Sequence, residues 1–263
     1  MKKRPTVYDL HQLKGTRKFL QLHVDNAFEA EAAEIAGIEV LSCEADHTLL
    51  GIRAAAPTAF ISAGLKNRTI ASAEQAIRMA FDAIEHGADS VYCSSSTEII
   101  EAMAREGIPV TGHVGLVPNH ATWTGFRAIG KAPEEAMKVY QALKRLENAG
   151  VCAVEVEVIP VKLAAFLTRN TPVITMGMGC GNACDTQYLF SSDVLGTNTG
   201  HYPRHSRKYA DIPAQLAKVQ QERIQAFQAF AADVGDGSYP AAAHQVDVDD
   251  ATFAAFTALL DRG

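Results

Sequence analysis

The sequence predicts an α/β fold, a (β/α)8 TIM barrel with extra helices at its C-terminal end. Short apolar runs of strand length alternate with amphipathic stretches of helical period from residue 19 to residue 195. Such alternation requires a parallel sheet, and eight strand-like runs suit a closed barrel better than an open sheet. Because no Pro- or Ser-rich linker divides the chain, we expect one domain over residues 1–263.

Each expected element has a local signal. The strands are the short apolar runs at 19–24, 39–43, 58–63, 90–94, 109–115, 152–159, 172–179 and 188–195. Among the helices, Ser72 with Glu74 is typical of a helix start, and Gly37 and Gly87 are typical helix ends. The expected helices lie at 27–37, 72–87, 97–107, 132–150, 161–170, 212–237 and 249–262.

Composition excludes several kinds of partner. The net charge is -6 and no segment is dense in Lys or Arg, so nucleic acid and anionic membranes are poor partners. No run approaches the roughly 20 apolar residues of a membrane span, and the basic N-terminus lacks the apolar region of a secretory signal. Five scattered cysteines suit a reducing cytoplasm, where we expect the protein. Cys180 and Cys184 have no second pair at the spacing of a zinc site.

A histidine stands where a barrel carries its chemistry. His113, in the segment GIPVTGHVGLVPNH, follows Gly112 at the carboxyl end of the fifth strand. Small neighbours let the backbone approach a ligand and leave the imidazole room to point into the barrel mouth. There it can hold a carboxylate or a carbonyl oxygen; the alternative is a core histidine with all its hydrogen bonds made.

Two glutamates on the sixth strand share one face. Glu155 and Glu157 are two residues apart, so their side chains point to the same side. Glu157 is nearer the mouth, where partial desolvation would raise the pKa of its carboxyl and make it a general base. The alternative is a salt bridge to Lys162. On the second strand, Glu44 or Asp46 could ligate a hard cation or could simply be solvated.

Three longer segments carry a family resemblance. They are GIPVTGHVGLVPN (107–119), VEVIPVKLAAFLT (156–168) and PVITMGMGCGNACDTQYLFSSDVLG (172–196). They resemble ketopantoate hydroxymethyltransferase, a family of the phosphoenolpyruvate mutase/isocitrate lyase superfamily. The resemblance implies a transferase of pantothenate biosynthesis that acts on a small 2-oxo acid, uses Mg²⁺ and methylene-tetrahydrofolate, and forms homo-oligomers. It places Glu157 on the family's glutamate.

The chain departs from the family pattern at the implied metal site. Ala45 falls on the metal-binding aspartate, with Asp46 next to it, and Ala63 falls on the second aspartate. Tyr92 replaces the substrate-binding lysine, and Ser94 replaces an outer glutamate. Mg²⁺ prefers several oxygen ligands, so a site reduced to Asp46 should bind it far more weakly. The metal ligands implied by the resemblance are therefore largely missing.

These observations lead to two hypotheses. The first is an enzyme that makes or breaks a carbon–carbon bond next to the carbonyl of a small 2-oxo acid, with altered metal dependence and substrate. Glu157 would be the base and His113 would hold the substrate, while Asp46, Tyr92 and Ser94 would complete the pocket. The alternative is a catalytically silent barrel that binds a small carboxylate or acts as an assembly partner. An ion pair locking Glu157 to Lys162 would favour it.

Overall fold

The chain contains two compact units. The computed structural model describes residues 3–260, and its contacts divide the chain into residues 1–210 and residues 211–263. The described strands all lie in the first unit, whereas the second contains α10 (Ile212–Asp236), a 3-10 turn at Ala242–His244 and α11 (Asp250–Leu260). The expectation of a single domain over 1–263 stays a prediction.

Eight parallel strands form a closed barrel in the order of the sequence, which confirms the predicted fold class. Each strand pairs with the next, and β1 pairs with β8 to close the cylinder. The strands are β1 (Phe19–His23), β2 (Val40–Glu44), β3 (Phe60–Gly64), β4 (Ser90–Tyr92), β5 (Val110–Gly115), β6 (Ala153–Glu157), β7 (Ile174–Met178) and β8 (Thr186–Phe190).

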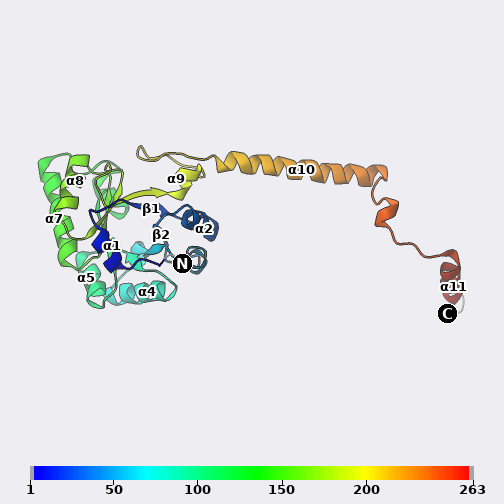
Figure 1. Ribbon diagram of the computed structural model, residues 1–263, viewed down its shortest axis with the longest axis horizontal. Coiled ribbons are helices and arrows are strands. Elements are labelled where there is room, and N and C mark those ends of the chain that lie inside the picture. The colour runs from blue at the N-terminus through cyan, green and yellow to red at the C-terminus, as the bar shows by residue number, and fades with distance from the viewer. Residues whose placement is uncertain (1–2, 261–263) are drawn as a thin grey trace. The chain divides into compact units, whose positions relative to one another are not determined.

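Helices surround the strands, as Figure 1 shows for α2, α4, α5, α7 and α8. Asn26 and Ser72 cap α2 and α4 by accepting hydrogen bonds from backbone N–H groups three residues on, which satisfies donors that the helix leaves unpaired. The helices between strands are α2 (Ala27–Ile35), α3 (Leu49–Ala55), α4 (Ala73–Glu85), α5 (Thr97–Arg105), α6 (Ala121–Thr124), α7 (Pro133–Asn148) and α8 (Val161–Arg169). None of the described helices is long and apolar enough to cross a membrane.

The structure differs from the expected elements where helices are short. α1 (Val7–Leu13), α3 and α6 were not predicted, since a segment of seven residues or fewer shows too little of the helical period. The last expected strand, 188–195, is wrong in its second half: β8 ends at Phe190, and α9 (Ser191–Leu195) follows and ends at Gly196 in the left-handed conformation. Of the expected helix 249–262, the last two residues lie outside the described residues.

Two apolar cores hold the barrel. One lies between the strands and the surrounding helices, where Leu41, Ile61 and Val154 pack with residues such as Ile100 and Leu143. The other closes the amino end of the barrel, where Leu10 of α1 packs with the first residues of several strands: Phe19, Val40, Phe60, Ala153 and Ile174. The amino end is therefore a packed plug, which leaves the opposite end for chemistry.

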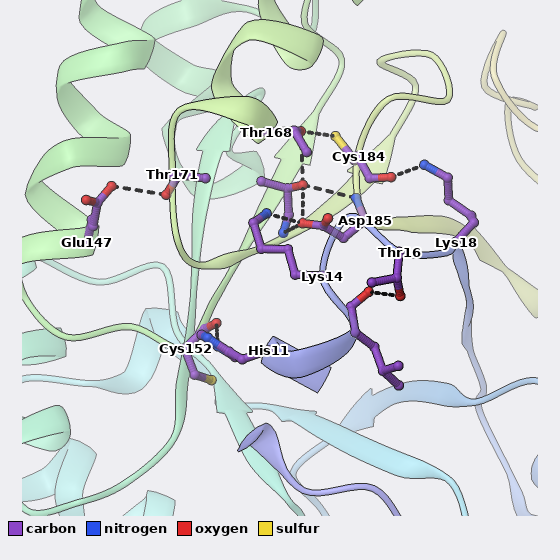
Figure 2. Close-up of polar contacts among 12 residues, drawn as sticks. His11, Lys14, Thr16, Lys18, Glu147, Cys152, Thr168, Thr171, Cys184 and Asp185 are labelled. Carbon is purple, nitrogen blue, oxygen red and sulfur yellow. Dashed lines mark hydrogen bonds and ion pairs between the residues drawn. The ribbon is translucent and has the colours of Figure 1, made fainter. Parts of the chain in front are cut away.

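Polar contacts fasten α1 and the following segment to the barrel (Figure 2). His11 Nε2 lies 2.9 Å from the carbonyl oxygen of Cys152. Lys14 Nζ lies 2.5 Å from the Asp185 carboxylate, whose side chain is only 3% exposed. Asp185 also accepts hydrogen bonds from the backbone N–H and the hydroxyl of Thr175. This buried carboxylate thus joins α1 to both β7 and the start of β8.

Removing the Asp185 carboxylate should destabilise the fold strongly. In Asp185→Ala, Lys14 loses its buried partner and Thr175 loses its acceptor, so we expect unfolding in urea to show a loss of roughly 3–5 kcal/mol. The control is Glu74→Ala, which removes an exposed pair with Arg78 and should cost roughly 0.3–0.5 kcal/mol. Equal losses in the two variants would contradict this role for Asp185.

Candidate active site

A cavity of about 240 Å³ opens at the carboxyl ends of the strands, the end at which TIM barrels carry their active sites. Every strand contributes to its wall, so its shape depends on closure of the whole barrel. The lining residues are His23, Ser42, Cys43, Glu44, Ser62, Gly64, Tyr92, His113, Pro118, Asn119, Glu155, Glu157, Met178, Tyr188 and Phe190. This volume suits a small organic acid rather than a drug-sized molecule.

The glycines around His113 have packing roles. A Cβ on Gly112 would lie 2.9 Å from a methyl carbon of Leu146, so this glycine lets α7 approach β5. Gly115 has φ of 95°, and a Cβ there would lie 2.1 Å from the carbonyl oxygen of Glu157. The glycines therefore bring α7 and the end of β6 close to β5. That they also let the backbone approach a ligand stays a prediction.

His113 lies between the two glutamates of β6. Its Nε2 is 3.2 Å from Glu157 Oε2, and its Nδ1 is 3.6 Å from Glu155 Oε2. The imidazole side chain is only 2% exposed. Lys162 is exposed, and the described residues contain no ion pair between it and Glu157. The structure thus brings together Glu157 and His113, the two residues that the sequence analysis proposed as base and substrate-binding residue.

The ring nitrogen of His113 nearest Glu157 is buried and makes no hydrogen bond to any residue that the structure describes. Although Nε2 lies at ion-pair distance from Glu157 Oε2, their geometry is not that of a hydrogen bond. Among the described residues, Nε2 of His113 is one of the few buried polar atoms without a hydrogen-bond partner. A buried polar atom left unpaired costs about 1–3 kcal/mol, so a ligand oxygen that paired with it would be bound more tightly.

The carboxyl of Glu155 has a raised pKa in this cavity. Burial and, to a smaller extent, the charge of Glu157 raise it from 4.5 to about 7, against the opposing effect of His113. The side chain of Glu155 is only 12% exposed, and loss of water around a carboxylate raises its pKa. The raised pKa expected at Glu157, nearer the mouth, stays a prediction.

A line of hydrogen bonds leads from the mouth to His113. Tyr92 Oη lies 2.8 Å from Nδ1 of His113. Ser94 interacts with the Tyr92 hydroxyl and accepts a hydrogen bond of 2.8 Å from Asn119 Nδ2. Burial raises the pKa of the Tyr92 phenol, so it remains protonated. Ser94 does not line the cavity itself and reaches it through Tyr92.

Several cavity residues, among them Ser42, Tyr188 and Asn119, were not predicted from the sequence. Tyr188 of β8 accepts a hydrogen bond of 2.8 Å from Ser42 Oγ of β2, and its ring stacks on Phe190. Both Ser42 and Tyr188 lie at inward-facing strand positions, which the alternation of side chains along a strand could have indicated. Asn119 was also missed, because it lies after the strand in a loop.

The backbone next to Glu157 is strained. Val158 has φ of 47°, which is rare for any residue with a Cβ and most unusual for a β-branched one. Its N–H donates to the carbonyl of Met178, and its carbonyl accepts from Ile129. Strain held by neighbouring contacts in this way is typical of functional sites, and here it fixes the end of β6 that carries Glu157.

Asp46 lies apart from this group. Its side chain is 45% exposed and accepts hydrogen bonds from the backbone N–H and hydroxyl of Thr48, which lower the pKa of its carboxyl. It does not line the cavity, whereas Glu44 does. No cluster of three His, Cys, Asp or Glu side chains suited to a metal occurs among residues 3–260. The donors present do not fit Mg²⁺, which requires several oxygen ligands.

The fold and the site define a TIM-barrel protein with acid–base side chains at the carboxyl ends of its strands. Residues 44–242 match the family model described as ketopantoate hydroxymethyltransferase. The 3-methyl-2-oxobutanoate hydroxymethyltransferase of Kosmotoga olearia is 31% identical over 252 residues, which are 86% of this chain and 92% of that protein. The chain therefore belongs to the ketopantoate hydroxymethyltransferase family, as the resemblance indicated.

Two further comparisons agree. The protein of the same name from Thermoanaerobacter sp. (strain X514) is 42% identical over 146 residues, which are 54% of this chain and 53% of that protein. The structure of 2,3-dimethylmalate lyase, a member of the phosphoenolpyruvate mutase/isocitrate lyase superfamily, has a TM-score of 0.55 at 10% identity. It covers 85% of this chain and 88% of the lyase. At this identity the likeness concerns the barrel fold.

The raised pKa of Glu155 should make stability depend on pH. The native state binds the Glu155 proton more tightly than the unfolded chain does, so this contribution is complete below about pH 4.5 and is lost as pH rises through about 7. The free energy of unfolding of Glu155→Gln, relative to that of the wild type, should therefore increase by on the order of 2 kcal/mol as pH rises from about 5 to about 8. Urea unfolding across this range measures the difference. A difference that stayed constant with pH would contradict the burial argument.

Proposed function

We propose that this protein forms or breaks a carbon–carbon bond next to the carbonyl of a small 2-oxo acid, without Mg²⁺. The observation that carries the proposal is the 3.2 Å separation of Glu157 Oε2 from His113 Nε2 inside the cavity. A carboxylate that can remove a proton stands beside a donor that can hold the oxygen on which the charge develops. The family membership supports the substrate class.

The proposed reaction begins with proton transfer. The Glu157 carboxylate takes the proton from the carbon next to the carbonyl, and the electron pair of that bond moves to the carbonyl oxygen to form the enolate. His113 holds this oxygen through Nε2–H. The enolate carbon then attacks the carbon of a one-carbon aldehyde, whose C=O π bond breaks. The aldehyde oxygen takes the proton back from Glu157, which restores the carboxylate; cleavage is the reverse. The total negative charge of the site is unchanged by the first step.

Tyr92 and Glu155 prepare His113 for this role. In the arrangement that we propose, the Tyr92 hydroxyl donates a hydrogen bond to Nδ1 of His113. The ring proton of His113 then lies on Nε2, facing Glu157. Because the pKa of Glu155 is about 7, this second carboxyl is protonated in a large share of molecules near neutral pH. It then adds no full negative charge beside the enolate, which a second carboxylate would disfavour.

The resemblance implied two cofactors, Mg²⁺ and methylene-tetrahydrofolate, and the proposed steps use neither. Because the side chains present do not fit Mg²⁺, the proposed steps use hydrogen bonds from His113 and Tyr92 in its place. Methylene-tetrahydrofolate is larger than a cavity of about 240 Å³ can enclose, so we assign no residue to it. Asp46 as a substrate or metal ligand, a cytoplasmic location and a homo-oligomeric state stay predictions.

The alternative of a catalytically silent barrel is less well supported. It would have been favoured by an ion pair between Glu157 and Lys162, whereas Glu157 faces His113 across the cavity. The strained Val158 next to Glu157 also supports a reactive site. Binding of a small carboxylate to a protein that never exchanged a substrate proton would establish the silent alternative.

Proton exchange tests the proposed base. We expect the protein to exchange the C3 hydrogen of 3-methyl-2-oxobutanoate for deuterium in D₂O, as followed by NMR, with no change when a chelator or Mg²⁺ is added. Glu157→Gln should slow this exchange by roughly 10²–10⁴-fold. Asp46→Asn should leave it unchanged. Exchange that needs Mg²⁺ and is lost in Asp46→Asn would refute the metal-free proposal.

Replacing Tyr92, which hydrogen-bonds to His113, should slow the exchange less than Glu157→Gln does. Tyr92→Phe keeps the ring but removes the hydroxyl that fixes the imidazole, so we expect exchange to fall by about 10-fold or more and its pH dependence to change. Tyr188→Phe is the matched control, since that hydroxyl bonds Ser42 and not His113. Equal losses and identical pH profiles in both variants would show that Tyr92 only fills space.

A further inference from the structure

Two cysteines lie together outside the cavity described above. Cys180 and Cys184 are on the crossover 179–185, which connects β7 to β8 without a helix. Their sulfur atoms are 3.6 Å apart, and both residues are almost fully buried, at 0% and 1% exposure. The proposed reaction uses neither thiol, so the pair needs a separate account.

The barrel leaves room for these two sulfurs on the outer face of β7. A Cβ on Gly177 would lie 2.7 Å from the Cβ of Cys184 and 3.2 Å from the sulfur of Cys180. Any larger residue at position 177 would push the crossover outward. The hydroxyl of Thr168, on α8, donates to the Cys184 sulfur at 3.6 Å, as Figure 2 shows. The pair is therefore held between a strand and a helix.

The surroundings make the two thiols unequal. The contact with Cys180 lowers the pKa of the Cys184 thiol to about 7, against the effect of burial, with help from Thr168 and Thr175. The same contact raises the pKa of the Cys180 thiol. These opposite directions favour a thiolate at Cys184 beside a protonated thiol at Cys180, which is the arrangement of an attacking and a resolving cysteine.

The pKa values of the other three cysteine thiols are all raised, unlike that of Cys184. Burial raises the pKa of the thiols of Cys43 and Cys152 to about 12, and it also raises the pKa of Cys93. Cys152 is nevertheless the most accessible of the five, since the other four are buried. Exposure alone would select Cys152 for oxidation, whereas thiolate character selects Cys184. This contrast makes the inference testable.

We propose that Cys180 and Cys184 form an oxidation site at which a small peroxide closes a reversible disulfide. The Cys184 thiolate attacks one oxygen of hydrogen peroxide, the O–O bond breaks, and sulfenic acid and hydroxide form; the hydroxide takes up the proton that Cys184 released. Cys180 sulfur then attacks the Cys184 sulfur, and the displaced hydroxide leaves as water with the Cys180 proton. Two thiols lose two electrons in total, and one peroxide becomes two waters.

The geometry allows the closure. A disulfide has a sulfur–sulfur length of about 2.05 Å, so the present separation of 3.6 Å must shorten by about 1.5 Å, shared between two side chains. Gly179 and Gly181 flank Cys180 with φ of 67° and 84°, in the left-handed region that glycine adopts readily. Gly181 and Asn182 are exposed, so one layer of the crossover separates the sulfurs from solvent.

Disulfide mapping of the peroxide-treated protein tests the site. The reduced protein is treated with hydrogen peroxide, unfolded, alkylated and digested, and the peptides are identified by mass spectrometry. We expect Cys180 and Cys184 in one disulfide that dithiothreitol reopens, and Cys152 alkylated. The initial rate should rise about tenfold per pH unit below 7 and level off above it, as the Cys184 thiolate forms.

Variants and controls complete the test. Cys180→Ala removes the resolving thiol, so no disulfide between these positions should form. It also removes the neighbouring sulfur that lowers the pKa of Cys184. The pH midpoint of Cys184 oxidation to sulfenic acid should therefore move up by about one unit or more. Cys152→Ser should behave as the wild type. Mapping of the wild type alone suffices if Cys180→Ala does not fold. Oxidation of Cys152 before the pair, or recovery of both Cys180 and Cys184 as alkylated residues, would overturn the inference.

Discussion

The pairing of β5 with β6 is the constraint on which the candidate site depends. Its register places His113 opposite Glu155, and Gly115 opposite Glu157. The imidazole therefore lies between the two carboxylates, within 3.6 Å of one and 3.2 Å of the other. A slip of one residue would turn both glutamates to the outer face, among the helices. The absence of side chains at Gly112 and Gly115 is what lets α7 and the end of β6 hold this register.

Burial and charge act against each other within this group. Each carboxylate in a low-dielectric cavity is unfavourable alone, and two within reach of each other are worse. Glu155 reduces this cost by holding a proton in a large share of molecules at neutral pH, since its pKa is about 7. The two glutamates therefore do not both need to carry a full negative charge in the cavity. Tyr92 and Ser94 provide hydrogen bonds where the family pattern has a lysine and a glutamate.

The fold and half of the site could be predicted from the sequence, for physical reasons. Strand length and alternation set the barrel, and position at a strand end selected His113 and Glu157, which lie together in the structure. The sequence indicated Glu155 only as a residue on the same face as Glu157. How strongly burial raises its pKa depends on segments that pack around it and are distant in the sequence. Asp46 as a site residue stays a prediction: Thr48, two residues away, binds its carboxylate, and Asp46 does not line the cavity.

The crossover from β7 to β8 links the two ends of the barrel. It begins after Met178, which lines the cavity, and ends at Asp185, which holds Lys14 at the amino end. Because this connection contains no helix of its own, the thiols of Cys180 and Cys184 themselves pack on β7. A change in their bonding therefore acts on a segment anchored at both ends. His113 and Glu157, to which we assign the proposed acid–base chemistry, lie on β5 and β6. The proposed acid–base and thiol chemistries therefore rest on different residues and can be tested separately.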